Sequence, residues 1–338
     1  MSKMSTSLRR HALSGAAMKT RWSALLLAPP EVDIVALEKA LARVVGRVDH
    51  QMSTWKPDSD LMRLNAASPD TWVSLPRELT QVLAKGLEIG RLSGGAFDIG
   101  VGRLVNAWGF GAAGSVPDME AIRAALRERS PPTHTVLELD APRARARKHA
   151  RFDLDLSGIA KGFAVDEMMR TVKAFGICDG LVGLDGELAA SGTRPDGKPW
   201  RVAVEKPDYE LRSPLGVIDL QDGAVATSGD YRHWVEIGGT RLSHTMDLSR
   251  GGPIDNRIAS ASVVASSCME ADAWSTALMV LGPTEAKALA GKYGFDALIV
   301  ERSDAALRQI GIGTTFEPIP PEAPLSGRLL DAVSPLWR

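Results

Sequence analysis

Three oxygen-bearing side chains lie close together in the segment MEADAWSTALMVLG, where Ser275 and Thr276 follow Asp272 by three and four residues. On a helix these spacings bring side chains to one face. One carboxylate and two hydroxyls form an all-oxygen donor set, which suits a hard cation such as Mg²⁺. A structural role is the alternative, because an Asp near a helix start commonly caps it and a Thr fills space. Spacing alone favours that alternative.

A second candidate is the segment DLSGIAKGFAVD, in which Gly158 and Gly162 flank Lys161. A strand-to-helix transition here would leave backbone N–H groups free to hold a phosphate, and Lys161 would add a positive charge. The pattern is not a P-loop. Glycines that allow tight packing of a turn explain the segment at least as well when it is taken alone.

Histidine and aromatic side chains give further candidates. His244 lies close to Asp247 in LSHTMDLSRGGP and could act as a general base, although a hydrogen-bonded structural histidine is the alternative. Trp55 and Phe97 occur in glycine- and turn-rich segments and could stack on a flat aromatic ligand. Anchoring the hydrophobic core is the commoner role for such aromatics.

The composition is that of a soluble globular protein, with 44% hydrophobic and 24% charged residues among 338. Lys plus Arg (40) nearly balances Asp plus Glu (41), which disfavours a general nucleic-acid binder. Cys178 and Cys268 lack the spacing of a zinc site. We find no signal peptide and no apolar run long enough to insert stably in a membrane. We therefore expect a cytoplasmic protein as the sequence stands, or a periplasmic one if the true N-terminus differs.

Hydrophobic periodicity predicts the elements that position these residues. We expect helices at residues 35–49, 77–92, 118–129 and 164–175 and from about residue 270, and strands at residues 22–28, 181–184, 200–205, 216–220, 224–228, 233–237, 258–265 and 296–301. Residues 136–156 predict a strand, a turn and a second strand at 152–156. One face of this segment would carry Arg143, Arg145 and Arg147. We interpret it as a solvated edge strand protected by charge and not as a basic patch that binds nucleic acid.

This alternation without regular βαβ units predicts an α+β fold of mixed, mainly antiparallel sheets with packed helices. No linker divides the chain convincingly. We expect one large domain at residues 16–310, an N-terminal arm at residues 1–15 and a Pro-rich tail at residues 311–338.

Taken in order, seven segments resemble the motifs of the ApbE family of FAD:protein FMN transferases. They are MSTWKPDSDLMRLN, GAFDIGVGRLVNAWGFG, DLSGIAKGFAVD, GELAASGTRPDGKPWRVAVEKP, AVATSGDYRHW, SHTMD and MEADAWSTALMVLG. The likeness runs from about Ala16 to Glu301. Seven matches in the family's order outweigh the structural alternatives for each segment.

The resemblance implies a fold related to tunnelling-fold proteins and a flavin site made by the residues Met18, Trp55, Ala96, Phe97, Asp98, Asp155, Lys161 and Met246. It also implies a Mg²⁺ held by Asp272, Thr276, Ser275 and the main-chain oxygen of Gly158. His244 matches a family histidine and would activate the acceptor hydroxyl. FAD is then a substrate, and the partner is a flavoprotein subunit or domain that offers a Thr or Ser.

The sequence departs from the family's usual pattern at four positions. Lys19 and Asp185 stand where glycines are usual, and Arg103 and Leu248 stand where prolines are usual. Two other functions remain open: a hydrolase that sends water to FAD and releases FMN and AMP, and a carrier that binds FAD without breaking it. Asp272, Thr276 and His244 favour an enzyme over a carrier.

Overall fold

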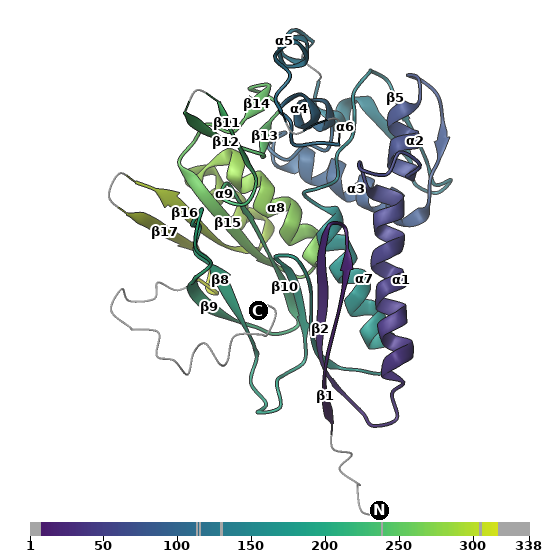
Figure 1. Ribbon diagram of the computed structural model, residues 1–338, viewed down its shortest axis with the longest axis vertical. Helices are drawn as coiled ribbons and strands as arrows, with labels where there is room; N and C mark the ends of the chain where they lie inside the picture. The colour runs from purple at the N-terminus through teal and green to yellow at the C-terminus, as the bar shows by residue number, and fades with distance from the viewer. Residues whose placement is uncertain are drawn as a thin grey trace, which may run out of the picture.

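An eight-stranded antiparallel sheet runs through the computed structural model, which describes residues 8–112, 114, 116–128, 131–237, 239–303 and 306–316 (Figure 1). In sheet order its strands are β1 (Arg9–Ala17), β2 (Thr20–Ala28), β6 (Asp179–Leu184), β7 (Glu187–Ser191), β10 (Gly223–Gly229), β15 (Ile258–Ala265), β16 (Asp296–Arg302) and β17 (Leu307–Ile312).

Helices cover one face of this sheet, and among them α8 packs on β10 and β15 while α7 packs on β6 and β7. Figure 1 shows α1 beside α7, with α4, α5 and α6 grouped at the upper end of the molecule. The helices are α1 (Ile34–Met52), α2 (Asp60–Ala66), α3 (Arg77–Leu92), α4 (Gly102–Ala107), α5 (Met119–Arg127), α6 (Thr133–Val136), α7 (Ala160–Ala174), α8 (Cys268–Leu281) and α9 (Pro283–Tyr293).

Four smaller sheets complete the described fold. They are β3–β5–β4 (Val73–Ser74, Arg145–Lys148, Leu137–Asp140), β8–β9 (Trp200–Glu205, Pro214–Leu220), β11–β12 (Trp234–Ile237, Thr240–Ser243) and β13–β14 (Met246–Asp247, Gly252–Pro253). Within the described ranges, no helix combines the length and the apolar composition needed to cross a membrane.

The inner strands of the large sheet contribute buried side chains to both faces, so the sheet separates two cores. Leu26 belongs to the core under the helices, whereas its neighbours Leu25 and Leu27 belong to the core under β8 and β9. This follows from the alternation of side chains along a strand. Because both faces of β2 are covered, its last five residues are all buried instead of alternating between buried and exposed.

Helices α7 and α8 meet at a very close contact. A Cβ on Gly162 would lie 2.3 Å from the main-chain oxygen of Cys268, so only glycine fits. Asp166, one turn further along α7, accepts hydrogen bonds from the N–H groups of Cys268 and Met269 at 2.8 and 2.9 Å. It therefore satisfies donors that the first turn of α8 leaves free.

The predicted α+β class is confirmed, and most predicted elements are present with shifted ends. Helix α1 continues to Met52, α7 begins at Ala160 and α8 begins at Cys268. A further strand, β17, follows the one predicted at residues 296–301. Residue 129 of the predicted helix at 118–129 and residues 317–338 of the expected tail lie outside the described residues.

Two predictions about strands need correction. The second strand after β4 is Arg145–Lys148 and not residues 152–156, and it is the middle strand of its sheet rather than an edge. Arg145 and Arg147 instead stack on Trp72 and pair with Asp140 and Glu138. Residues 9–15 of the expected N-terminal arm form most of β1, so the boundary expected at residue 16 falls inside a strand. Residues 1–7 lie outside the described part.

We predict that Gly162→Ala lowers the free energy of unfolding by about 1–3 kcal/mol, because the added methyl group must push α7 and α8 apart. The matched control is Gly291→Ala in α9, where a Cβ would meet nothing within 4 Å. Since Ala favours helix more than Gly, that variant should be unchanged or more stable by up to about 1 kcal/mol. Urea unfolding of both variants measures the difference, and equal stability of the two would contradict the close contact.

Candidate functional site

The three oxygen-bearing residues predicted on one helix all lie on α8, and Ser228 of β10 contacts two of them. The Ser228 hydroxyl lies 2.8 Å from Ser275 Oγ and 3.1 Å from Thr276 Oγ1. Both α8 hydroxyls also donate to the main-chain oxygen of Asp272, at 2.8 and 3.3 Å. The result is a cluster of oxygen atoms at the contact between α8 and the sheet.

Asp272, whose main-chain oxygen belongs to this cluster, is buried, with 3% of the residue exposed. Its Oδ2 accepts a hydrogen bond from the Gly162 N–H at 3.0 Å, across the α7–α8 contact. Burial, reinforced by the nearby Glu187 carboxylate, raises the pKa of Asp272 to about 8, against the opposing effects of Lys161 and the Gly162 N–H. Ionisation of Asp272 therefore costs free energy in the folded chain, and a bound cation would lower that cost.

Lys161 is paired with carboxylates rather than free. Its Nζ lies 2.6 Å from Glu187 Oε1 and 3.6 Å from Asp185 Oδ2. Burial alone would lower the pKa of Lys161, but Glu187, Asp272 and Asp185 together raise it, so the ammonium stays charged. Glu187 is itself buried, and its Oε2 has no hydrogen-bond partner among the described residues. Three carboxylates thus surround one ammonium.

The Gly158 turn contacts the hydroxyl cluster directly. A Cβ on Gly158 would lie 2.9 Å from Thr276 Oγ1 and 3.3 Å from a ring carbon of Phe97. The turn of DLSGIAKG and the helix of ADAWST are therefore neighbours, although more than a hundred residues separate them. Phe97 is buried in the main core with 4% of the residue exposed, so its edge supports the turn.

The carboxylates of Asp98 and Asp155 shape loops. Asp98 Oδ1 accepts from the Gly100 N–H and Thr133 Oγ1, and its Oδ2 accepts from the Thr133 N–H. Asp155 Oδ1 accepts from the Ser157 N–H at 2.8 Å. Ala96 lies in the turn after α3, directly before the buried residues Phe97 and Asp98. These hydrogen bonds fix the segments that meet at Gly158.

The imidazole of His244 is held in a defined orientation. Its Nδ1 lies 3.2 Å from the main-chain oxygen of His233, and its ring makes edge contacts with His233 and Phe110. A carbonyl oxygen only accepts, so Nδ1 carries the proton and Nε2 presents a lone pair. Burial, with the nearby His233, lowers the pKa of His244 to about 4. The ring is therefore neutral at physiological pH and able to accept a proton.

Met18, Trp55 and Met246 lie in three separate segments. Met18 packs against the main core from the β1–β2 turn, and Met246 is buried in β13, two residues after His244. Trp55 is 47% exposed, and Lys19 Nζ lies 3.0 Å from the centre of its ring. The β1–β2 turn therefore contacts the loop after α1.

The backbone explains two of the four departures from the family pattern. Lys19 has φ of 60° and Asp185 has φ of 57°, in the left-handed region that glycine adopts without strain. Each therefore stands where glycine would be easiest. Both introduce a charge: Lys19 lies over Trp55, and Asp185 lies beside Lys161.

Two residues of the candidate site, Ser228 in the hydroxyl cluster and Glu187 beside Lys161, were not singled out from the sequence. Both occur in motif segments, in AVATSGDYRHW and GELAASG. Pairing of Lys161 with an acidic residue could have been anticipated, because a buried ammonium requires one. Among the described residues, no group of three or more His, Cys, Asp and Glu side chains is arranged to hold a metal, so a cation would depend on hydroxyl and main-chain oxygens as well.

Comparisons with known proteins identify close relatives over most of the chain. Residues 18–299 match the model of the ApbE family. A Vibrio cholerae FAD:protein FMN transferase is 34% identical over 310 residues, which cover 90% of this chain and 91% of that protein. An Escherichia coli FAD:protein FMN transferase is 33% identical over 86% of this chain and 84% of its own length. The structure of Pseudomonas stutzeri flavinyl transferase ApbE superposes with a TM-score of 0.80 at 34% identity, covering 90% of this chain and 95% of that one.

We predict that Asp272→Asn stabilises the metal-free protein at alkaline pH. Because the pKa of Asp272 is raised from 3.8 to about 8 on folding, its protonated form favours the folded state, and this stability is lost as pH rises from about 4 through about 8. The asparagine variant cannot ionise. Its advantage should be absent near pH 4 and reach a few kcal/mol, to order of magnitude, above pH 8. Thermal unfolding in a chelator across this range measures it, with the exposed cap variant Asp33→Asn as control. Parallel pH profiles for Asp272→Asn and its parent would contradict the burial of a costly charge.

Proposed function

The chain belongs to the ApbE family and is an enzyme of the transferase class, and we propose that it is a Mg²⁺-dependent FAD:protein FMN transferase. In this proposal the FMN half of FAD is moved to a Thr or Ser hydroxyl of an acceptor flavoprotein, and AMP is released. The observation that carries it is the buried Asp272 on α8, whose carboxylate accepts from the Gly162 N–H and whose main-chain oxygen accepts from the Ser275 and Thr276 hydroxyls. Ser228 and the Gly158 turn lie against those hydroxyls.

The residues present fit a magnesium ion. Asp272 Oδ2 takes the Gly162 N–H, while Oδ1 accepts no hydrogen bond from the described residues and is available to a cation. Asp272, Ser275, Thr276 and the main-chain oxygen of Gly158 would hold the ion, and all of them offer oxygen. The surrounding charge agrees, since Asp272, Glu187 and Asp185 outnumber Lys161. When bound, Mg²⁺ would neutralise negative charge on the pyrophosphate.

FAD would occupy the region between the Gly158 turn and the β1–β2 turn. Lys161, kept charged by its carboxylates, would orient a phosphate, and Met18, Trp55 and Met246 would contact the flavin half. Ala96 and Phe97 would support the ligand from the turn after α3. Asp98 and Asp155 would act through the loops that they hold, because their oxygens already bind backbone and hydroxyl groups.

The transfer step uses His244 as the base. The acceptor oxygen attacks the phosphorus on the FMN side of the pyrophosphate, and its proton passes to His244 Nε2, the nitrogen with the free lone pair. The new O–P bond forms as the bond from that phosphorus to the bridging oxygen breaks. AMP leaves with this oxygen and its electron pair. Positioning and electrostatic stabilisation, rather than a covalent enzyme intermediate, carry such a reaction.

Mass spectrometry tests the proposal directly. The purified chain is incubated with FAD, Mg²⁺ and a candidate apo flavoprotein, and the acceptor is analysed for the added mass of FMN. An adduct on a Thr or Ser, with AMP in equal amount, is expected. Free FMN and AMP without an adduct would identify a hydrolase. Unchanged FAD would indicate a carrier that binds FAD without breaking it.

We predict that Asp272→Ala abolishes Mg²⁺-dependent FMN transfer while the fold persists, because it removes the only charged ligand of the proposed ion. Thr276→Val removes one neutral oxygen at nearly constant volume and should be milder. Transfer rates measured at saturating FAD over a range of Mg²⁺ concentrations, with circular dichroism as a control for folding, separate the two. A greater loss in Thr276→Val would show that Thr276 does something other than bind the ion.

We predict that His244→Ala lowers the single-turnover rate of transfer by about 10² to 10⁴-fold and leaves FAD affinity nearly unchanged. Because burial lowers the pKa of His244 to about 4, the parent rate should rise with pH through about 4 and be flat around neutrality. Fluorescence titration measures FAD binding, and quenched-flow FMN transfer measures the chemical step. Weak FAD binding with a normal rate at saturation would instead make His244 a ligand-binding residue.

A further inference from the structure

The β11–β12 hairpin leads directly into His244. Residue His233 precedes β11 and His244 follows β12, and the His244 N–H donates to the His233 oxygen at 3.3 Å. Trp234 pairs with Ser243, so the two histidines continue the register of the hairpin by one pair. A partner segment that binds along this hairpin would therefore extend to the imidazole of His244.

The hairpin has two distinct faces because side chains alternate along each strand. Val235, Ile237 and Leu242 lie on the same face as His244, since Val235 pairs with Leu242 and the alternation continues to residue 244. Ile237 is 37% exposed, and Val235 and Leu242 are half-buried. The face that carries His244 is thus an apolar strip that remains open to solvent.

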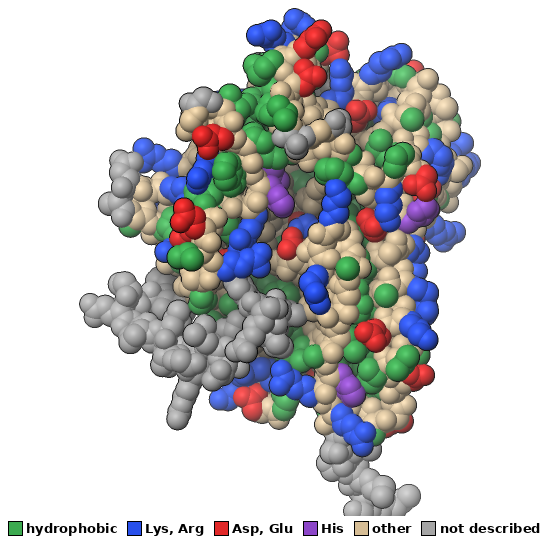
Figure 2. Space-filling model, viewed as in Figure 1, with side chains coloured by type: hydrophobic (Ala, Val, Ile, Leu, Met, Phe, Trp, Pro, Cys, Tyr) green, Lys and Arg blue, Asp and Glu red, His purple; other side chains and the backbone are tan. Residues whose placement is uncertain are grey.

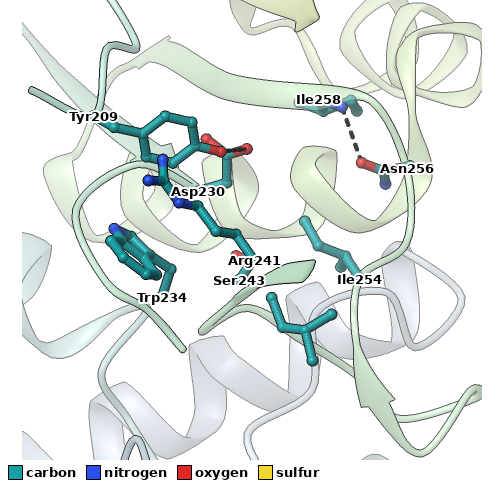
Figure 3. Close-up of a pocket in the computed structure, with 9 residues that line it drawn as sticks. Tyr209, Asp230, Trp234, Arg241, Ser243, Ile254, Asn256 and Ile258 are labelled. Atoms are coloured by element: carbon teal, nitrogen blue, oxygen red, sulfur yellow. Dashed lines mark hydrogen bonds between the residues drawn. The ribbon is translucent and has the colours of Figure 1, made fainter. Parts of the chain in front are cut away.

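The opposite face anchors the hairpin to the body of the protein. Arg241 lies between two aromatic rings, with its guanidinium carbon 4.5 Å from the Tyr209 ring centre and 4.4 Å from that of Trp234 (Figure 3). Tyr209 also donates to Asp230. These residues line a cavity of about 60 Å³, which is far too small for a nucleotide. This face is therefore a support, and the His244 face is the one available to a partner.

A second apolar group lies around α5. Val116, Met119 and Leu126 are 76%, 51% and 42% exposed. The segment is fixed beside the site by Phe110, whose ring contacts His244, and by Leu126, which lies against Gly251. A pocket of about 270 Å³, lined in part by Val116, Ala121 and Ala124, opens beside these side chains.

Exposed apolar side chains are concentrated here. Of the nine large ones exposed among the described residues, four lie in the α5 segment and on the His244 face of the β11–β12 hairpin: Val116, Met119, Leu126 and Ile237. Figure 2 shows hydrophobic side chains gathered over these elements at the upper part of the molecule. Scattered apolar residues need no explanation, but a group around a reactive side chain marks an interaction surface.

We propose that Val116, Met119, Leu126 and Ile237 form the acceptor face, which docks the flavoprotein segment that carries the target hydroxyl. The inference rests on the proposed function, which requires a second protein to reach His244 Nε2. The acceptor is the occupant because the strip on the hairpin is continuous with His244, so a chain bound along it presents its hydroxyl to the base. The pocket beside α5 receives an apolar side chain of the same partner.

Placing a charge on the acceptor face without changing the reaction site tests this. Ile237→Asp and Met119→Asp each place a carboxylate on the acceptor face, at positions exposed enough for folding to persist. The matched control is Val35→Asp on α1, a residue that is 61% exposed and belongs to neither the α5 segment nor the β11–β12 hairpin. The probe is an apo flavoprotein domain first shown to be modified by the Vibrio cholerae relative.

Each acceptor-face variant should raise the KM for the acceptor by about tenfold, which corresponds to the loss of a contact worth about 1.4 kcal/mol. The rate at saturating acceptor and the Kd for FAD should change less than about twofold, and Val35→Asp should match the parent. Unchanged KM in both variants, or a parallel loss of FAD affinity, overturns the acceptor face. If the parent itself forms no FMN adduct, the proposed function fails first, and the docking inference fails with it.

Discussion

The burial of Asp272 at the contact between α7 and α8 is the constraint on which the rest of the site depends. A carboxylate removed from water requires donors, and the Gly162 N–H can reach it only because that residue has no side chain. The same close approach lets Asp166 receive the first N–H groups of α8. It also places the Gly158 turn against Thr276. One short helix contact therefore sets the positions of the carboxylate, the hydroxyls and the turn.

Local patterns were sufficient for the part of the site that lies on one element. The three- and four-residue spacing in ADAWST placed Asp272, Ser275 and Thr276 together, and the structure has them on one helix. Glu187 and Ser228 were missed because their partners are distant in sequence: Glu187 pairs with Lys161, and Ser228 contacts α8 from β10. Contacts between different strands and layers depend on the tertiary fold. The hydrophobic periodicity within one segment therefore does not predict them.

The errors in the fold have similar causes. Strand β1 has the sequence RRHALSGAA, which is poor in the β-branched and aromatic residues typical of strands, and it is held in place by pairing with the apolar β2. The basic segment that contains Arg145 looked like a turn between strands. It forms the middle strand because Trp72, Asp140 and Glu138 supply partners for its arginines. In both cases tertiary contacts outweighed the local preference.

The two outer strands of the large sheet have consequences for self-association. A sheet edge offers unpaired backbone groups to which a second copy could add a strand, and the long sheet has such an edge at β1 and another at β17. The edge at β1 carries the exposed side chains of Arg9 and Arg10, whose charges repel an identical strand. At β17 the chain turns back, and the main-chain oxygen of Phe316 lies so close to Gly311 that no Cβ would fit between them. Aggregation through strand addition is thus opposed by charge at the β1 edge, whereas Phe316 packs on a face of β17 and leaves its edge to be protected by other means.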